Sequence, residues 1–193
     1  MITHVKGKLV EKNPTYVIVE AGGIGYFLNI SLNTFSQLPE EESVFLYTFL
    51  SVKEDSQTLF GFTTKIERAL FKLLISVSGV GPSIARTMLS SMTTDEIKHA
   101  IATGNSDVIQ SVKGIGAKTA QRVIIDLKDK ILKSFAIDEV SMPLSNTTKE
   151  EALTALEVLG FMRKQAEKVI DKILASDANL KVEQLIKMAL KKL

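Results

Sequence analysis

Two stretches in the middle of this chain share one pattern, 35 residues apart. The first reads VSGVGPSIARTML (77–89) and the second VKGIGAKTAQRVI (112–124). Their two glycines, the aliphatic residue between them, the alanine and the last aliphatic residue coincide. Each stretch follows a segment of helical periodicity and opens another, since apolar residues recur at three- and four-residue spacing. The sequence therefore predicts a helix, a Gly-x-Gly hairpin and a second helix, twice over.

The repeated hairpins have the features of a phosphate-binding site. Glycine permits positive φ and a close approach of the backbone to a ligand, and a helix N-terminus presents N–H groups to an anion. Pro82 suits the first position of a helix, where its missing N–H costs nothing. Phosphate contacts ignore base identity, so we predict sequence-independent DNA binding. The candidate DNA-binding residues are Gly79, Val80, Gly81, Ser83, Lys113, Gly114, Ile115, Gly116, Lys118 and Arg122.

Other interpretations of these glycines fit less well. A Gly-x-Gly pair can mark a tight connection between helices and nothing else, but two copies in a basic segment favour a ligand. A P-loop requires Gly-Lys-Ser/Thr, whereas residues 116–119 read Gly-Ala-Lys-Thr. A dinucleotide fingerprint that starts at Gly23 needs a small residue at Leu28 and a following helix, where a strand pattern continues. We expect no cofactor.

Composition narrows the functional classes. The net charge is +2, but residues 1–62 carry −3, residues 63–132 carry +4 and residues 133–193 carry +1, so the hairpins lie in the basic part, where a polyanion would bind. The chain has no cysteine and two histidines, which argues against disulfides, thiolate chemistry and a metal site. No signal-peptide pattern and no membrane-length apolar run occur. We expect a cytoplasmic protein without membrane contact and without catalytic residues.

The periodicity divides the chain into four segments. Residues 1–62 alternate as five short strands separated by turns, which predicts an OB-like β-barrel. Residues 63–133 are helical, with capping-box patterns at 64–67 and 93–96 and a helix end at Gly104. Residues 134–147 have no period and are predicted to be a flexible linker. A third capping-box pattern, at 148–151, predicts a three-helix bundle over 148–193. The fold class is α+β, with several domains.

With these segments in this order, the sequence resembles the RuvA family, the junction-binding subunits of the bacterial Holliday-junction branch-migration machine. The resemblance covers the whole chain. Besides both hairpins it rests on Gly22-Gly-Ile-Gly-Tyr26, on Lys53-Glu-Asp-Ser-Gln57 followed by Leu59-Phe-Gly-Phe62, and on the segment from Leu156 to Phe161. Two positions depart from the family pattern: Ser83 and Ala117 stand where members often carry lysine.

The resemblance implies an architecture and partners. It implies an OB-like barrel, a double helix-hairpin-helix domain, and a mobile UBA-like domain of three helices that binds the hexameric ATPase RuvB. It implies homotetramers, or octamers, that hold a four-way DNA junction open in recombination, repair and the SOS response, with the RuvC resolvase as a further partner. Glu54 and Asp55 would form an acidic pin at the crossover. Leu156, Leu159 and Phe161 would face RuvB.

The sequence leaves two rival functions open. One is a helix-hairpin-helix DNA glycosylase with lyase activity, because Lys118 follows the second hairpin where such enzymes place a Schiff-base lysine. Residues 136–138, Ala-Ile-Asp, distantly resemble their catalytic aspartate segment, but the spacing differs and a β-barrel precedes the hairpins. The other is a scaffold that never contacts DNA.

Overall fold

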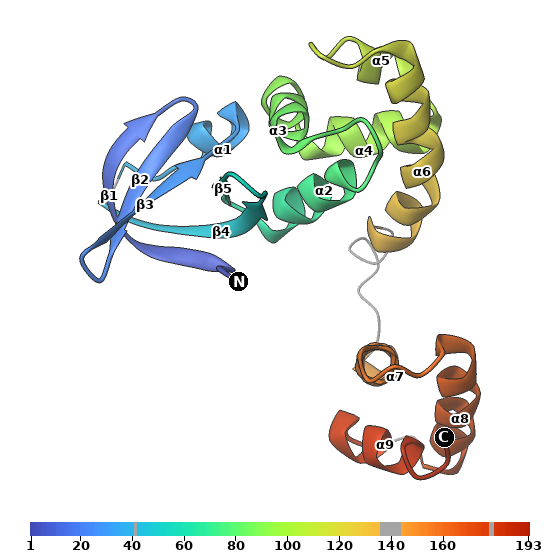
Figure 1. Ribbon diagram of the computed structural model, residues 1–193. Coiled ribbons are helices and arrows are strands. Elements are labelled where there is room, and N and C mark those ends of the chain that lie inside the picture. The colour runs from blue at the N-terminus through green and yellow to red at the C-terminus, as the bar shows by residue number, and fades with distance from the viewer. Residues whose placement is uncertain (41, 136–143, 178–179) are drawn as a thin grey trace. The chain divides into compact units, whose positions relative to one another are not determined.

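The computed structural model describes residues 1–40, 42–135, 144–177 and 180–193 (Figure 1). The chain divides into two compact units, Met1–Ala136 and Ile137–Leu193. The first unit contains a barrel followed by helices, and the second contains helices alone.

Five strands close into a barrel at the N-terminus (Figure 1). They are β1 (His4–Asn13), β2 (Tyr16–Ala21), β3 (Ile24–Asn29), β4 (Ser43–Val52) and β5 (Gln57–Phe62), with the short helix α1 (Leu32–Ser36) between β3 and β4. The order around the barrel is β1-β2-β3-β5-β4, and the β3–β5 pair is parallel. β1 passes β2 so closely that a Cβ on Gly7 would lie 2.0 Å from the carbonyl oxygen of Glu20. The five-stranded, OB-like barrel expected from the sequence is confirmed.

The remaining helices of the first unit follow the barrel in the sequence. They are α2 (Lys65–Ile75), α3 (Pro82–Ser91), α4 (Thr94–Thr103), α5 (Ser106–Gln110) and α6 (Ala117–Phe135). Their apolar faces bury a common core that includes Leu74, Met88, Ile101, Val123 and Leu127. The capping box at Thr93 and Glu96 is complete, and Gly104 ends α4 in the left-handed conformation (φ +76°), as expected for a C-terminal glycine.

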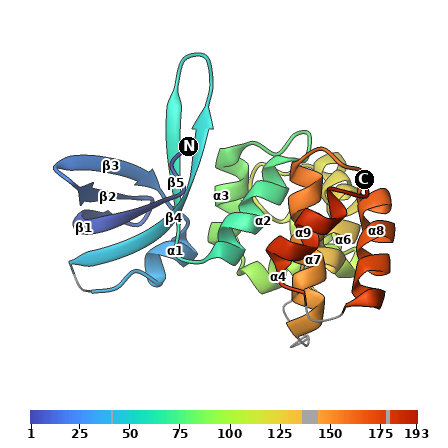
Figure 2. The ribbon, with the colours of Figure 1, turned by 90° about the horizontal axis from the view of Figure 1, so that it is seen from below.

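One aromatic residue joins this helical core to the barrel. Phe71 of α2 is fully buried and lies among Phe49 of β4 and Phe60 and Phe62 of β5, with ring centroids 5.0–5.4 Å apart. Tilted ring pairs at such separations stabilise a contact beyond the area that they bury. Because of this contact, α2 packs directly on the β4 and β5 side of the barrel (Figure 2).

The second unit consists of α7 (Leu144–Val158), α8 (Arg163–Ser176) and α9 (Val182–Ala189). Their shared core contains Leu153, Leu156, Ile170, Ile173 and Leu185. About 50 residues give only a small core, and salt bridges from Lys149 to Asp171 and from Arg163 to Glu150 add contacts between α7 and α8. The predicted bundle of three helices is confirmed.

Two local expectations need correction. The pattern at 148–151 does not cap α7, because the helix already begins at Leu144 and Thr148 lies inside it. The predicted linker over 134–147 overlaps helix at both ends, since α6 reaches Phe135 and α7 starts at Leu144; residues 136–143 lie outside the described residues. In the part of the chain that the structure describes, no helix is long and apolar enough to cross a membrane.

Candidate nucleic-acid interface

The two hairpins have the same backbone geometry. Gly79 and Gly114 both adopt φ +96°, a left-handed value that favours glycine. In the first hairpin the N–H of Val80 donates to the carbonyl of Val77 (3.0 Å), and in the second the N–H of Ile115 donates to the carbonyl of Val112 (3.1 Å). The duplicated sequence therefore produces a duplicated turn.

The helices after the hairpins also begin alike. The N–H of Ala85 donates to the carbonyl of Gly81 and the N–H of Ala120 to that of Gly116. Pro82 occupies the first turn of α3, and no side chain among the described residues caps that helix. Because the first N–H groups of a helix have no acceptor within it, they are available to an anion beside the hairpin.

Each hairpin packs against the helix that follows the other hairpin. A methyl group built on Gly79 would lie 3.5 Å from Oγ1 of Thr119 in α6, and one built on Gly114 would lie 3.9 Å from Cγ1 of Ile84 in α3. Residues 84 and 119 are equivalent in the repeat, so the two motifs meet as a pseudo-symmetric pair. In addition, Nη1 of Arg122 donates to the carbonyl of Ser78 (3.3 Å), which ties α6 to the first hairpin. The pair thus forms one surface with two equivalent sites.

The candidate residues differ in what they can offer to DNA. The side chains of Val80 and Ile115 are buried, so these two can contribute only their backbone. The remaining eight are exposed: Gly79, Gly81, Ser83, Lys113, Gly114, Gly116, Lys118 and Arg122. Ser83 stands in the first turn of α3 and Ala117 starts α6, so two positions where the family often has lysine lie at the helix starts without a charge.

The lysines near the second hairpin are free to bind phosphate. Within the described ranges, no carboxylate forms an ion pair with Lys113 or Lys118. Other cations of this unit are engaged: Lys98 lies 2.6 Å from Asp95, and Arg86 donates to Oδ1 of Asn29 in the barrel (2.8 Å). The positive charge available at the hairpins is therefore concentrated at the second one.

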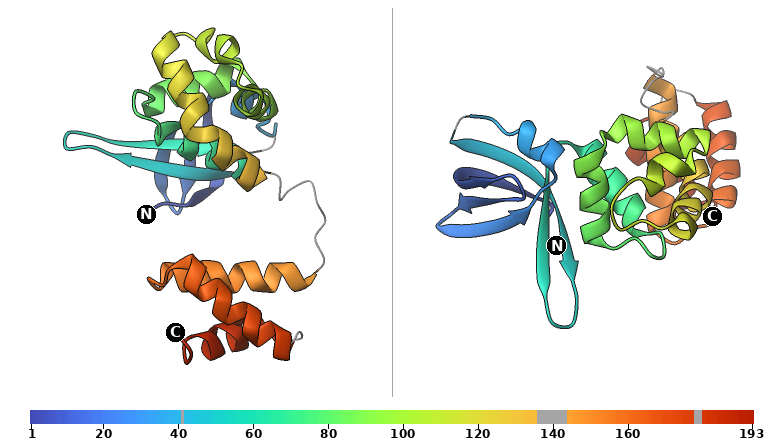
Figure 3. Two further views of the ribbon diagram at one scale, coloured as in Figure 1. Left: turned by 90° about the vertical axis from the view of Figure 1, so that its right-hand side faces the viewer. Right: turned by 90° about the horizontal axis from the view of Figure 1, so that it is seen from above.

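An acidic loop lies at the tip of the β4–β5 hairpin, which extends away from the barrel as a two-stranded ribbon (Figures 2 and 3). Val52 pairs with Gln57, so residues 53–56 form the loop, closed by the N–H of Lys53 donating to the carbonyl of Ser56 (2.8 Å). Glu54 and Asp55 are both exposed there. Two carboxylates at the end of a projecting ribbon repel any phosphate that approaches them.

The second unit has an exposed apolar surface beside the end of α7. Val158 and Leu159 are 83% and 58% exposed, and an open groove is lined by Glu150, Glu151, Thr154, Ala155, Val158, Leu159 and Ile186. Leu156, by contrast, is completely buried, so its proposed contact with a partner is replaced by a role in the core.

A helix-ending motif explains the positions of Leu156 and Phe161. Gly160 has φ +96°, the N–H of Phe161 donates to the carbonyl of Leu156, and the N–H of Gly160 donates to that of Glu157. This is a Schellman motif, in which the residue after the glycine packs on the last helical turn, and Phe161 accordingly packs against the core that contains Leu156. Of the three residues proposed to face a partner, Leu159 is the exposed one.

The described residues around the hairpins do not bring together the groups that a lyase would use. Among the described residues, no acid pairs with Lys118, and the segment 136–138 that resembles a glycosylase aspartate lies outside them. The described part of the chain also contains no group of three His, Cys, Asp or Glu side chains that could hold a metal ion.

Known families match all three parts of the chain. The model described as RuvA N terminal domain matches residues 1–61, the SAM-like Helix-hairpin-helix tandem matches residues 71–129, and RuvA, C-terminal domain matches residues 148–193. These matches coincide with the barrel, the paired hairpins and the three-helix bundle.

Full-length relatives carry one common name, "Holliday junction branch migration complex subunit RuvA". The chain is 63% identical to the protein of Christiangramia forsetii and 58% identical to that of Flavobacterium psychrophilum, over the full length of both sequences in each case. It is 49% identical to the protein of Cytophaga hutchinsonii over 99% of both chains. Together with the barrel, the paired hairpins and the terminal bundle, this similarity shows that the chain belongs to the RuvA family.

Proposed function

We propose that this protein binds four-way DNA junctions without reading their sequence, holds them open, and recruits a RuvB-type hexameric ATPase that moves the branch point. The observation that carries the proposal is the pair of equivalent hairpins on one rigid surface. Two phosphate sites at a fixed separation suit the regular backbone of a duplex arm. Four copies of the chain, as a homotetramer, would match the four arms.

The parts of the chain divide this work. Residues 63–133 contact the arms through the hairpins, and residues 1–62 place Glu54 and Asp55 at the crossover, where their charge discourages stacking of the arms. Residues 148–193 bind the motor through the apolar surface at Leu159. The chain itself supplies no catalytic group: ATP hydrolysis belongs to the motor, and strand cleavage belongs to a RuvC-type resolvase. The setting of this work is the cytoplasm.

The exposed surface at Leu159 suits a partner that binds through apolar side chains. Large apolar side chains that are exposed together mark protein contact sites, and the groove next to them is flanked by Glu150 and Glu151. A partner segment with aliphatic side chains and a neighbouring basic residue would satisfy both features.

Gel mobility shifts test the DNA-binding proposal. Four-way, three-way and linear duplex DNA of one base composition, each in two permuted sequences, are compared at one fixed salt concentration. We expect the four-way junction to bind most tightly, whatever its sequence, and the affinity to fall as salt is raised. Equal affinity for linear and four-way DNA would contradict the proposal. A covalent adduct trapped on abasic DNA by borohydride would instead indicate the lyase.

A further inference from the structure

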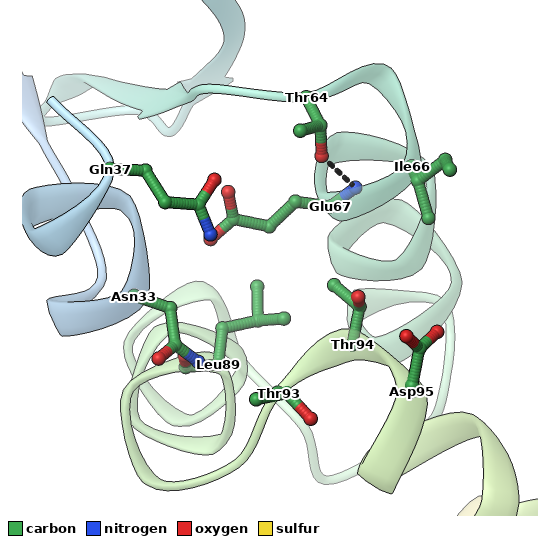
Figure 4. Close-up of a pocket in the computed structure, with 9 residues that line it drawn as sticks. All are labelled: Asn33, Gln37, Thr64, Ile66, Glu67, Leu89, Thr93, Thr94 and Asp95. Atoms are coloured by element: carbon green, nitrogen blue, oxygen red, sulfur yellow. Dashed lines mark hydrogen bonds between the residues drawn. The ribbon is translucent and has the colours of Figure 1, made fainter. Parts of the chain in front are cut away.

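Glu67 is a buried carboxylate at the boundary between the barrel and the helices. It is 3% exposed, and it belongs to the first turn of α2. The capping-box pattern at 64–67 predicts that its carboxylate turns back to the N-cap residue. Only half of that box forms: Oγ1 of Thr64 accepts the N–H of Glu67 (Figure 4), while the carboxylate itself reaches across to the barrel.

The carboxylate binds two hydroxyl groups of the barrel segment. Oγ of Ser31 donates to Oε1 (2.7 Å), and Oγ1 of Thr34 lies 2.9 and 2.8 Å from Oε1 and Oε2. Both partners are buried, at 2% and 0% exposed. Ser31 also caps α1 by accepting the N–H of Thr34. Bonds to a charged acceptor are short, directional and roughly twice as strong as neutral ones, so they fix α1 against α2 in one arrangement.

α1 is bound on its other side to α3. Nδ2 of Asn33 donates to the carbonyls of Leu89 (2.7 Å) and Met92 (2.8 Å), and the N–H of Leu32 donates to Oγ of Ser90 (3.1 Å). The first hairpin lies between α2 and α3. Both of its flanking helices are therefore tied to one short barrel helix, and the acidic loop belongs to that same barrel.

The apolar contact at Phe71 cannot set this arrangement alone. Burial of apolar surface is non-directional, so the aromatic cluster holds the barrel and the helices together but constrains their rotation weakly. A cavity of about 200 Å³, lined in part by Asn33, Gln37 and Glu67 (Figure 4), leaves room beside this contact. Directional hydrogen bonds must supply the remaining constraint.

We propose that Glu67 is a positioning residue, which fixes the barrel and its acidic loop relative to the two DNA-binding hairpins. This inference rests on the proposed function only for its consequence in junction binding; the positioning itself is a property of the free protein. In a junction the acidic loop must lie at the crossover while the hairpins hold the arms, because a displaced loop would bring its carboxylates against the phosphates of an arm. A linear duplex needs the hairpins alone. Loss of the bonds to Glu67 should therefore impair junction binding selectively.

Spin-label distances measure the positioning directly. The chain has no cysteine, so a Glu20→Cys, Asp129→Cys pair can be labelled uniquely, on β2 of the barrel and on the outer face of α6, and diluted with unlabelled protein. Glu67→Ala should broaden the distance distribution, and Glu67→Gln, which keeps a hydrogen-bonding group of the same shape, should restore it. Thr34→Val is a milder variant that removes one donor and should broaden it partly.

Glu96 provides the matched control. It occupies the same position in α4, and its carboxylate turns back to the N–H and hydroxyl of Thr93 in a complete capping box. Glu96→Ala should therefore weaken a helix cap without broadening the distance distribution. In gel shifts, Glu67→Ala should weaken junction binding by about tenfold or more, the loss expected when bonds to a charged group are removed, and should affect linear duplex far less.

The outcomes separate the two proposals. A folded Glu67→Ala protein with an unchanged distance distribution would overturn the positioning role. If Glu67→Ala does not fold, Thr34→Val decides by the same criterion. Broadened distances in a protein whose wild type shows no junction preference would support the positioning role and overturn the proposed function.

Discussion

The left-handed glycines of the hairpins allow the phosphate-binding surface to be separated from the stability of the fold. Gly79 and Gly114 have φ +96°, and Gly104, at the end of α4, has φ +76°. An added methyl group meets nothing closer than 3.5 Å at Gly79, 3.9 Å at Gly114 and 4 Å at Gly104. Replacement by alanine therefore introduces backbone strain of about 1–3 kcal/mol at each site, without a steric clash in the chain.

The three alanine variants should differ in DNA binding. All three should lower the free energy of unfolding by a similar amount, measured by urea denaturation. Gly79→Ala and Gly114→Ala should also weaken junction binding by about tenfold or more, since the methyl group and the altered turn keep phosphate from the backbone, and about 1.4 kcal/mol corresponds to tenfold. Gly104→Ala should bind like the wild type. If the hairpin variants are destabilised as much as Gly104→Ala and still bind the junction normally, the hairpins do not hold phosphate.

Three further predictions concern other parts of the chain. Glu54→Gln with Asp55→Asn should leave junction binding unchanged or tighter, because repulsion of phosphate is removed while the shape is kept; gel shifts that show a clear loss of affinity would mean that the carboxylates are structural. The pKa of Glu67 is raised, because the effect of burial, which raises it, outweighs the hydrogen bonds from Ser31 and Thr34, which lower it. The folded state therefore takes up this proton more readily than the unfolded state, so the contribution of Glu67 to stability is greatest below its ordinary carboxyl pKa and is lost as pH rises through the raised value. Urea titrations should accordingly show the wild type gaining stability relative to Glu67→Gln as pH falls toward 4.5, and a difference that is constant with pH would refute the raised pKa. Leu159→Ala should leave folding and junction binding intact but weaken the protein's stimulation of branch migration by the motor, because the apolar contact with the motor is reduced. Branch migration at the wild-type rate with this variant would show that the motor binds elsewhere.

Features encoded by local sequence could be predicted well. The Gly-x-Gly repeat indicated both turns, since only glycine readily adopts φ +96°. Alternating apolar residues predicted the barrel, and Thr93 with Glu96 predicted a helix start that the structure has. In each case the residues that decide the conformation lie within a few positions of one another.

Features that depend on distant contacts could not be predicted. The sequence at 64–67 matches a capping box, but Glu67 finds partners more than 30 residues away in Ser31 and Thr34. The predicted start of the α7 helix at Thr148 was wrong, and the helix begins at Leu144. A capping pattern favours a helix start at its own position but does not prevent the helix from starting earlier. The spacing from 156 to 161 does not reveal that Leu156 is buried under Phe161, because that depends on how α7 packs on α8 and α9.

The geometry of the bound junction tests the central claim most directly. Single-molecule energy transfer is measured between dyes on the ends of neighbouring arms, for both kinds of neighbouring pair, in magnesium that stacks the free junction into two unequal pairs. With protein bound, we predict one energy-transfer value, equal for the two pairs, as expected for four arms held open and equivalent. Retention of the unequal, interconverting values of the stacked junction at saturating protein would contradict the account.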